Sequence, residues 1–248
     1  MRVLVLGVGD TFTKVHYTTS ALIEAPGGYV LLDCPDLIHR VIHEGTSKAG
    51  WSVDSQDVHD VLLTHLHGDH CNGLESLAFA HRYRQYRPDA PTGQLSVHTS
   101  RPVADRLWER LAPAMDAADT GTPRTADDFF QLHVLEPETD ASIAGLTIRC
   151  RFTTHPLPTI GLLISDGQWT LGWSGDTGFD QAHIDWLAQS DVIVHESNLS
   201  VAHTPIESLN ALPDDLRARM CLVHLPDNFD QSATDIRVLR EGDMLEGP

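Results

Sequence analysis

The amino-acid sequence predicts a single α/β domain whose strands are mostly antiparallel. Its 248 residues suit one large domain with a sizeable core, so residues 1–248 are treated as one unit. Hydrophobic residues make up 41% of the chain and charged residues 21%, which is ordinary for a soluble globular protein. Apolar runs of strand length recur along the chain, with segments of helical composition between and outside them.

The first half of the chain alternates predicted strands and helices. Residues 2–6 form an apolar run. Residues 20–24 and 29–33 indicate a hairpin, because Pro26-Gly27-Gly28 between them suits a turn. Further strands are expected over residues 57–64 and 95–98, and helices over residues 36–44, 72–86 and 101–111. Residues 112–127, rich in Ala, Asp, Thr and Pro, are expected to form a surface loop.

The second half is richer in strands. We expect them over residues 132–135, 146–154, 161–165, 169–173, 192–195 and 220–223. Gly167 suits the turn between the third and fourth of these. A helix is expected over residues 180–188, and residues 236–244 suit a short closing strand or hairpin.

Neither the glycines nor the cysteines of the sequence indicate a nucleotide or redox cofactor. Gly7-Val8-Gly9-Asp10 follows the first strand but lacks the third glycine and the helical pattern of a dinucleotide-binding loop. The four cysteines include no Cys-x-x-Cys pair, and three lie in or beside apolar runs. We therefore expect reduced and mostly buried thiols.

One stretch carries four potential metal ligands within six residues. His65, His67, Asp69 and His70 come directly after the apolar run 61–63. His65 and His67 alternate with other residues, so both imidazoles can point at one position. Asp69 and His70 can point at a second position, which suggests two neighbouring metal ions. The alternative is a surface loop in which some of the 15 histidines cluster by chance. The strand-to-loop context and further ligands downstream argue against that alternative.

Three more potential ligands stand at the ends of predicted strands. They are His155, Asp176 and His224. Pro156 would end the strand ladder directly after the first of them. Each residue alone is a weak signal, because single histidines and turn aspartates are common. In this order, each at a strand end, they form a strong pattern.

His-x-His-x-Asp-His after an apolar strand resembles the signature of the metallo-β-lactamase fold superfamily, and the resemblance covers nearly the whole chain. It implies an α+β protein built as a four-layer αββα sandwich. It also implies two metal sites, with His65, His67 and His155 at one, Asp69, His70 and His224 at the other, and Asp176 bridging them. Asp33 would support the metal loop, which carries His65 to His70, by contacting ligands on the side away from the ions. An equal alternative is that Asp33 is a turn residue at a strand end.

The implied chemistry is hydrolysis by a metal-bridged hydroxide. Two divalent ions, zinc first with manganese or iron as alternatives, lower the pKa of a shared water, and the hydroxide attacks phosphorus or a carbonyl carbon. Asp69 then counts among the catalytic residues as well as the ligands. Asp176 stands where the antibiotic-destroying zinc β-lactamases typically use cysteine, so the resemblance points to the broader hydrolase branches.

The motif form is closest to the tRNase Z-like phosphodiesterases. His67-Gly68-Asp69-His70 followed by Asn72-Gly73-Leu74 resembles their metal loop, and Glu196 and His203 occupy places similar to two later segments. The resemblance implies that His203 protonates the leaving group and that Glu196 orients or tunes it. The alternative is that His203 merely precedes a helix, because Thr204-Pro205-Ile206-Glu207 suits a capping box.

A small phosphodiester or nucleotide is the expected substrate. The formal net charge of -18 argues against a large nucleic acid as partner, and no long Gly/Pro-rich arm that could grip tRNA is present. Arg82, Arg84 and Arg87, interleaved with tyrosines, could hold a phosphate and stack a base. The alternative for these arginines is a solvated helix end.

Two other functions stay open. The same metals could serve a carboxylic-ester, thioester or lactone hydrolase, or a metal-binding protein without turnover, although a full ligand set argues against the latter. A cytoplasmic location is expected, because no apolar run has membrane-spanning length and residues 1–7 are too short for a signal peptide. A homodimer is a further option, since tRNase Z-like proteins are commonly dimers.

Overall fold

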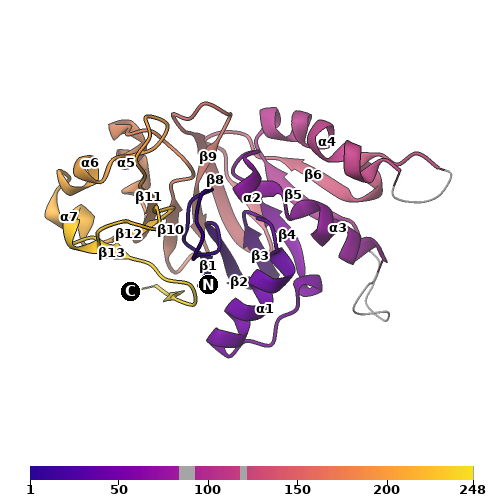
Figure 1. Cartoon of the computed structure of the whole chain (residues 1–248), viewed down its shortest axis with the longest axis horizontal. Helices are drawn as coiled ribbons and strands as arrows, with labels where there is room; N and C mark the ends of the chain where they lie inside the picture. The colour runs from indigo at the N-terminus through magenta and orange to yellow at the C-terminus, as the bar shows by residue number, and fades with distance from the viewer. Residues whose placement is uncertain (84–92, 118–121, 248) are drawn as a thin grey trace.

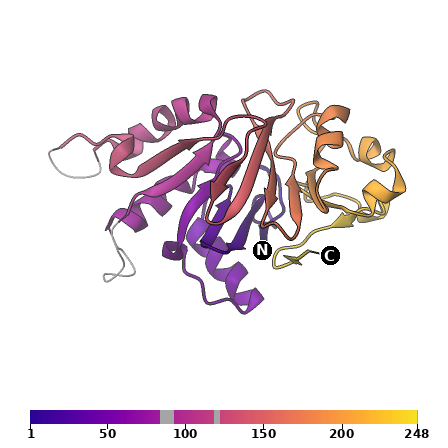
Figure 2. The same cartoon turned by 180° about the vertical axis from the view of Figure 1, so that it is seen from behind.

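The computed structural model describes residues 1–83, 93–117 and 122–247. Two β-sheets pack face to face, and helices cover their outer faces (Figure 1, Figure 2). Among the described residues each sheet has seven strands, in the orders β14-β1-β2-β3-β4-β5-β6 and β13-β12-β11-β10-β9-β8-β7.

The first sheet and its helices come mainly from the N-terminal half. The strands are β1 (Arg2–Gly7), β2 (Ser20–Ala25), β3 (Gly28–Leu32), β4 (Val58–Leu62), β5 (Leu95–Thr99), β6 (Phe130–Val134) and β14 (Met244–Leu245). The helices are α1 (Ile38–Ala49), α2 (Gly68–Cys71), α3 (Leu74–Tyr83) and α4 (Arg101–Met115), with 3₁₀ turns at η1 (Ser55–Asp57) and η2 (Ala126–Asp128).

The second sheet and its helices follow in the C-terminal half. The strands are β7 (Ala141–Ile143), β8 (Leu146–Phe152), β9 (Ile160–Ser165), β10 (Thr170–Trp173), β11 (Val192–Glu196), β12 (Met220–Val223) and β13 (Arg237–Val238). The helices are α5 (Gln181–Leu187), α6 (Ile206–Asn210) and α7 (Asp214–Arg217), with a 3₁₀ turn at η3 (Gln231–Ala233).

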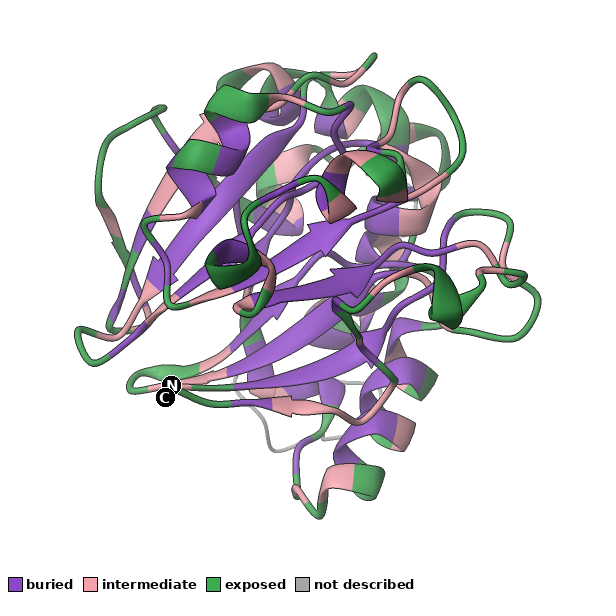
Figure 3. Cartoon of the chain, turned by 90° about the vertical axis from the view of Figure 1, so that its left-hand side faces the viewer, coloured by how far each residue is buried: buried purple, intermediate pink, exposed green. Residues whose placement is uncertain are grey.

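Three apolar clusters separate the four layers. Alternation along β1 sends Leu4 toward the cluster shared with α1, α3 and α4, and sends Val5 into the cluster between the two sheets. Ile193 of β11 belongs to the third cluster, under α5, α6 and α7. Figure 3 accordingly shows the strands of both sheets largely buried, while the helices expose one side. The expected αββα sandwich is confirmed.

The expectation of mostly antiparallel strands is wrong, because both sheets are mixed. The antiparallel pairs are β14–β1, β1–β2, β2–β3, β7–β8, β8–β9 and β9–β10. The strands from β3 to β6 pair in parallel, as do those from β10 to β13. Parallel neighbours need a crossover, and helices α1, α3, α4 and α5 supply most of them. The sequence shows these helices, but strand periodicity carries no information on strand direction.

Most predicted elements are present with shifted ends. The helix expected over residues 36–44 begins at Ile38, because Leu37 is its N-cap in a left-handed conformation with φ of 60°, and it continues to Ala49. The predicted loop over 112–127 is shorter than expected, since α4 runs through Pro113 to Met115. All four cysteines are buried and unbonded to one another, as predicted.

No helix among the described residues is long and apolar enough to cross a membrane. The two ends of the chain meet in the first sheet, where Val3 of β1 pairs with Leu245 of β14 (Figure 3).

The cluster between the sheets should dominate the stability of the fold. Ile164 of β9 lies fully buried there, so Ile164→Ala should lower the free energy of unfolding by about 2–5 kcal/mol and Ile164→Val by about 0.5–1.5 kcal/mol. Urea denaturation measures both. Val201→Ala is the control, because this side chain is fully exposed and its loss should change stability by less than about 0.5 kcal/mol. Equal losses at both positions would contradict the layered core.

Candidate metal centre

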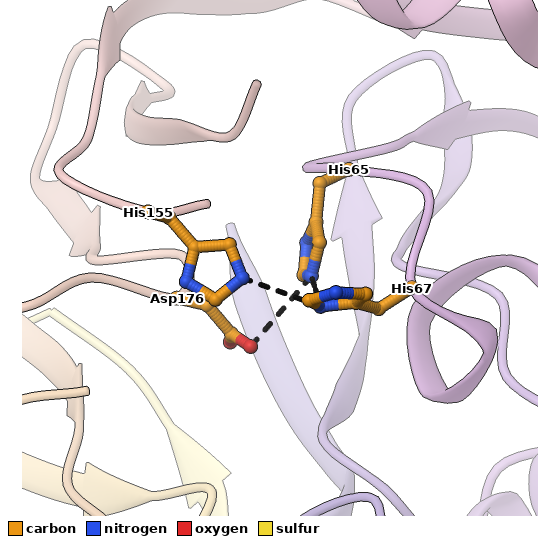
Figure 4. A group of neighbouring side chains, drawn as sticks. All are labelled: His65, His67, His155 and Asp176. Carbon is orange, nitrogen blue, oxygen red and sulfur yellow. Dashed lines mark hydrogen bonds and ion pairs between the residues drawn. The ribbon is translucent and has the colours of Figure 1, made fainter. Parts of the chain in front are cut away.

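The predicted ligands meet at one edge of the sandwich, where strands of both sheets end. His65 and His67 leave the end of β4 on the first sheet. His155 and Asp176 leave the ends of β8 and β10 on the second sheet. Figure 4 shows that the two pairs approach from opposite sides and point at one another. The edge between the two sheets therefore gathers residues that are far apart in the sequence.

The first ligand group has the spacing of a bound cation. His65 Nε2 lies 3.0 Å from His67 Nδ1, which lies 3.2 Å from His155 Nε2, and Asp176 Oδ2 lies 3.6 Å from His65 Nε2 (Figure 4). A tetrahedral zinc with Zn–N bonds of about 2.0–2.1 Å would place its ligand atoms roughly 3.3–3.4 Å apart. His67 Nδ1 has at most one proton, so it cannot donate to both facing nitrogens. A shared cation would satisfy all three.

The second ligand group lies beside the first. Asp69 Oδ2 is 3.4 Å from His70 Nε2 and 3.3 Å from His224 Nε2. Asp176 Oδ1 is 3.5 Å from His70 Nε2, and its Oδ2 is 3.6 Å from both His224 Nε2 and His65 Nε2. His70 Nε2 is buried and makes no hydrogen bond to any described residue, as expected of an atom that faces a metal position. The Asp176 carboxylate thus lies between the two groups.

Asp33 fixes the metal loop from behind. It is fully buried, its Oδ2 accepts from His70 Nδ1 at 2.7 Å, and its Oδ1 accepts from the Thr64 amide at 2.8 Å. The Thr64 hydroxyl contacts Asp33 and, at 3.0 Å, His65 Nδ1. These bonds leave Nε2 of both histidines facing the centre. The turn alternative also describes Asp33, because its φ of 57° lies in the left-handed region where the chain leaves β3.

Charge inside the centre controls the protonation of the ligands. Burial lowers the pKa of His70 and His224, but neighbouring carboxylates outweigh it. Asp176 and Asp33 raise the pKa of His70 well above its usual value, and Asp176 and Asp69 raise the pKa of His224 to about 9. For His65, burial dominates and lowers the pKa well below the usual value. The metal-free centre at neutral pH therefore holds protons on His70 and His224.

His203 lies in the centre together with Glu196. Its Nδ1 donates to Glu196 Oε1 at 2.8 Å, and the same oxygen accepts from the Thr177 amide at 2.8 Å. The His203 ring centroid is 5.1 Å from that of His224 and 5.6 Å from that of His155. Glu196 is 2% exposed, and burial raises its pKa. The geometry thus places an imidazole with a buried carboxylate partner against both ligand groups.

The capping-box alternative for this segment is wrong. The residue that caps α6 is Pro205, and no side chain accepts a hydrogen bond at the cap. The Thr204 hydroxyl instead donates to the Thr177 carbonyl at 2.8 Å. A tertiary contact therefore takes the hydroxyl that the local pattern assigned to the helix.

The predicted arginine cluster is only partly described. Arg84 and Arg87 lie outside the described residues. Arg82 donates to the Asp128 carbonyl at 2.9 Å, and its guanidinium lies 5.2 Å from the Phe129 ring centroid. Arg82 therefore fastens the end of α3 to the segment before β6, and a role for it in substrate binding stays a prediction.

Sequence reasoning missed several residues that hold the ligands. The Ala202 carbonyl accepts from His155 Nδ1 at 3.2 Å. Asn198 donates to the His224 carbonyl and to the Asp10 carboxylate, at 3.0 Å each. The only signal for Asp10 was its place after Gly7 and Gly9 at the end of the first strand. Because that segment does not fit a dinucleotide-binding loop, no role for Asp10 was predicted from the sequence.

Comparison with known proteins assigns the chain to a family. A family model described as Anti-Pycsar protein Apyc1 matches residues 1–243. The chain belongs to this Anti-Pycsar Apyc1 family. The Anti-Pycsar protein Apyc1 of Bacillus phage 010DV004 is 26% identical over 255 residues, which cover 97% of this chain and 95% of the relative.

Two more distant proteins extend the Apyc1 family comparison. The cGMP-dependent 3',5'-cGMP phosphodiesterase A of Dictyostelium discoideum is 23% identical over 97% of this chain and 27% of its own length. The metallo-β-lactamase fold protein YhfI from Bacillus subtilis superposes with a TM-score of 0.80 at 18% identity, over 99% of both chains. The predicted metallo-β-lactamase fold is confirmed. The described residues also form the groups of histidines and aspartates that could hold a metal ion, as predicted.

Metal uptake by this Apyc1 family member should release protons. At pH 7 the metal-free protein carries protons on His70 and His224, and a metal ion must displace them, so zinc binding should release at least about two protons, with one more if a bound water ionises. Because the pKa of His224 is about 9, the release should decrease as the pH rises through that value. Calorimetric titration in buffers of different ionisation enthalpy measures it. His224→Gln should release about one proton fewer, and zinc binding without proton release would contradict the charge assignment.

Proposed function

We propose that this protein is a two-metal phosphodiesterase whose substrate is a cyclic nucleotide. The observation that carries the proposal is the Asp176 carboxylate, which lies between two complete ligand groups beside the His203–Glu196 pair. The Dictyostelium relative, whose name gives 3',5'-cGMP as substrate, supports the nucleotide class. Residues 1–248 would act as one catalytic domain.

The ligand atoms fit two divalent ions. His65 Nε2, His67 Nδ1 and His155 Nε2 would hold one ion, and Asp69, His70 Nε2 and His224 Nε2 the other, with Asp176 shared. Imidazole and carboxylate donors suit zinc first, with manganese and iron as alternatives. When bound, two such ions supply a nucleophile from water near neutral pH and neutralise charge on a phosphodiester.

His203 is proposed to protonate the leaving oxygen. Its Nδ1–H bond to Glu196 fixes the ring orientation, so Nε2 is the ring atom that can deliver a proton. Cleavage of a cyclic phosphodiester releases a ribose alkoxide, which is a poor leaving group without a proton. After the transfer, Nε2 takes up a proton from water before the next turnover.

The small size of a cyclic nucleotide suits the charge of the chain. A formal net charge of -18 repels a long polyanion, whereas a single phosphodiester meets only the local field of the metal centre. Phosphate contacts by Arg84 and Arg87, assembly as a homodimer and a cytoplasmic location remain part of the proposal.

A hydrolysis panel with metal analysis tests the function. The purified protein should cleave cyclic nucleotides and bis-p-nitrophenyl phosphate but not a thioester, a lactone or a β-lactam, and chelation should abolish the cleavage. Asp176→Ala should lose both metal and activity, because it removes the bridge between the ligand groups. Asp215→Ala, an exposed acidic residue of α7, is the control and should keep both. Cleavage of the carboxylic substrates alone would move the protein to the esterase branch.

The proton-donor role of His203 can be separated from a structural one. His203→Ala should slow cyclic-nucleotide cleavage by about 10²–10⁴-fold, because the alkoxide then leaves without a proton. Cleavage of bis-p-nitrophenyl phosphate should fall far less, since p-nitrophenolate needs no proton. Steady-state kinetics on both substrates measure the difference, with the exposed His43→Ala as control. Equal losses on both substrates would leave His203 with a structural role only.

A further inference from the structure

One side-chain amide joins three loops at the edge of the metal centre. Asn198 Nδ2 donates to Asp10 Oδ2 and to the His224 carbonyl, both at 3.0 Å, and its Oδ1 accepts from the Leu199 amide at 2.7 Å. These partners lie after β1, β12 and β11 respectively. All three loops leave strand ends near the ligands. The backbone already joins them in pairs, because β11 pairs with β12 and Gly9 forms a β-bridge with Leu225, and the Asn198 amide adds one side chain that contacts all three.

The donor and acceptor pattern at this point suits asparagine and no charged residue. Two acceptors face the NH₂ group and one backbone donor faces the carbonyl oxygen, which determines the orientation of the amide. Asp10 is 4% exposed, and its other oxygen accepts from the Phe12 amide at 2.9 Å. An aspartate at position 198 would place a second carboxylate against Asp10 and would lose both donors.

His224 depends on this contact more than the other ligands do. Its φ of 59° is in the left-handed region, which a residue with a Cβ adopts only when its surroundings impose it. Its Nδ1 is buried and has no hydrogen-bond partner among the described residues, whereas Nδ1 of His70 and of His155 are held by Asp33 and by the Ala202 carbonyl. The orientation of the His224 ring is therefore fixed through its backbone.

The same amide belongs to the loop that carries His203. The Asn198 backbone N–H donates to the Thr204 carbonyl at 3.2 Å, and the Ser197 hydroxyl donates to the same carbonyl at 2.9 Å. The His203 amide donates to the Ser200 carbonyl at 3.0 Å. The segment 197–204 is thus closed on itself, and Asn198 is the side chain that ties it to His224.

We propose that Asn198 is a positioning residue that sets two parts of the centre at once. It holds the backbone of His224, so that Nε2 faces Asp69 and Asp176, and it holds the loop that presents His203 to the substrate. Asp10 orients the amide from the other side. The inference rests on the proposed two-metal phosphodiesterase, and it assigns to Asn198 and Asp10 a role in metal binding and in leaving-group protonation.

The first test measures zinc binding without reference to activity. Metal-free Asn198→Ala, titrated with zinc against a competing chelator, should bind one of two ions about 10–100-fold more weakly than the wild type, with the other ion unaffected. Asn198→Asp has almost the same shape and should show at least the same loss, so the test survives if the alanine variant folds poorly. Asp10→Asn keeps an acceptor oxygen and should lose less. Asn228→Ala, an exposed asparagine after β12, is the matched control and should bind as the wild type does.

The second test follows the leaving group at saturating zinc. Asn198→Ala should then lower kcat more for a cyclic nucleotide than for bis-p-nitrophenyl phosphate, because the His203 loop has lost its side-chain contact with the His224 backbone. Unchanged zinc affinity together with an unchanged ratio of the two substrates would overturn the proposal, even if the melting temperature fell.

Failure of the proposed two-metal phosphodiesterase function would give different results in the same experiments. A wild type that binds two zinc ions but cleaves no cyclic nucleotide would overturn the proposed substrate, while the zinc titration would still decide the role of Asn198. A wild type that binds a single zinc ion would overturn both.

Discussion

The Asp176 carboxylate is the constraint on which the centre depends. It is 3% exposed, and it contacts both ligand groups, because Oδ1 faces His70 while Oδ2 lies between His65 and His224. Burying a carboxylate is costly unless cations surround it. Its position in turn depends on Gly175, whose φ is 60° and where a Cβ would lie 2.5 Å from the Ile160 carbonyl oxygen. The bridge between the two groups therefore requires glycine before the aspartate, because no other residue fits that turn.

Around this carboxylate, hydrogen bonds between side chains and backbone link each loop of the centre to the next. The Thr153 hydroxyl donates to the Asp176 carbonyl at 2.7 Å, and the Thr177 amide donates to Glu196, which holds His203. The loops after β8, β10 and β11 are thus linked in series, and the sheets behind them are rigid because both of their faces are buried. The structure shows a preorganised site built on strand ends, which suits chemistry that depends on exact ligand spacing.

The parts of the site that the sequence revealed are those with a local pattern. The four ligands between His65 and His70 lie close in sequence, and the three later ligands could be found because each follows an apolar strand. Asn198 and Asp10 could not be found, since they are ordinary residue types 188 positions apart whose contact exists only in the folded chain. The parallel or antiparallel pairing of the strands was also missed, because it too exists only in the folded chain. The local capping pattern at Thr204 was misleading, because a tertiary partner takes its hydroxyl.

The balance of charge in the centre shows how its buried carboxylates can be tolerated. Four carboxylates, those of Asp33, Asp69, Asp176 and Glu196, lie together with at most 6% of each side chain exposed. In the metal-free protein, protons on His70 and His224 offset only part of this charge. Two divalent cations would offset all four carboxylates once they have displaced the protons of His70 and His224. A single ion in the first ligand group would balance the same charge only while His70 and His224 keep their protons, and the second ligand group would then hold no metal. Because the net charge of -18 repels anions at long range, neutralisation of the centre by cations is what would allow the proposed phosphodiester to approach.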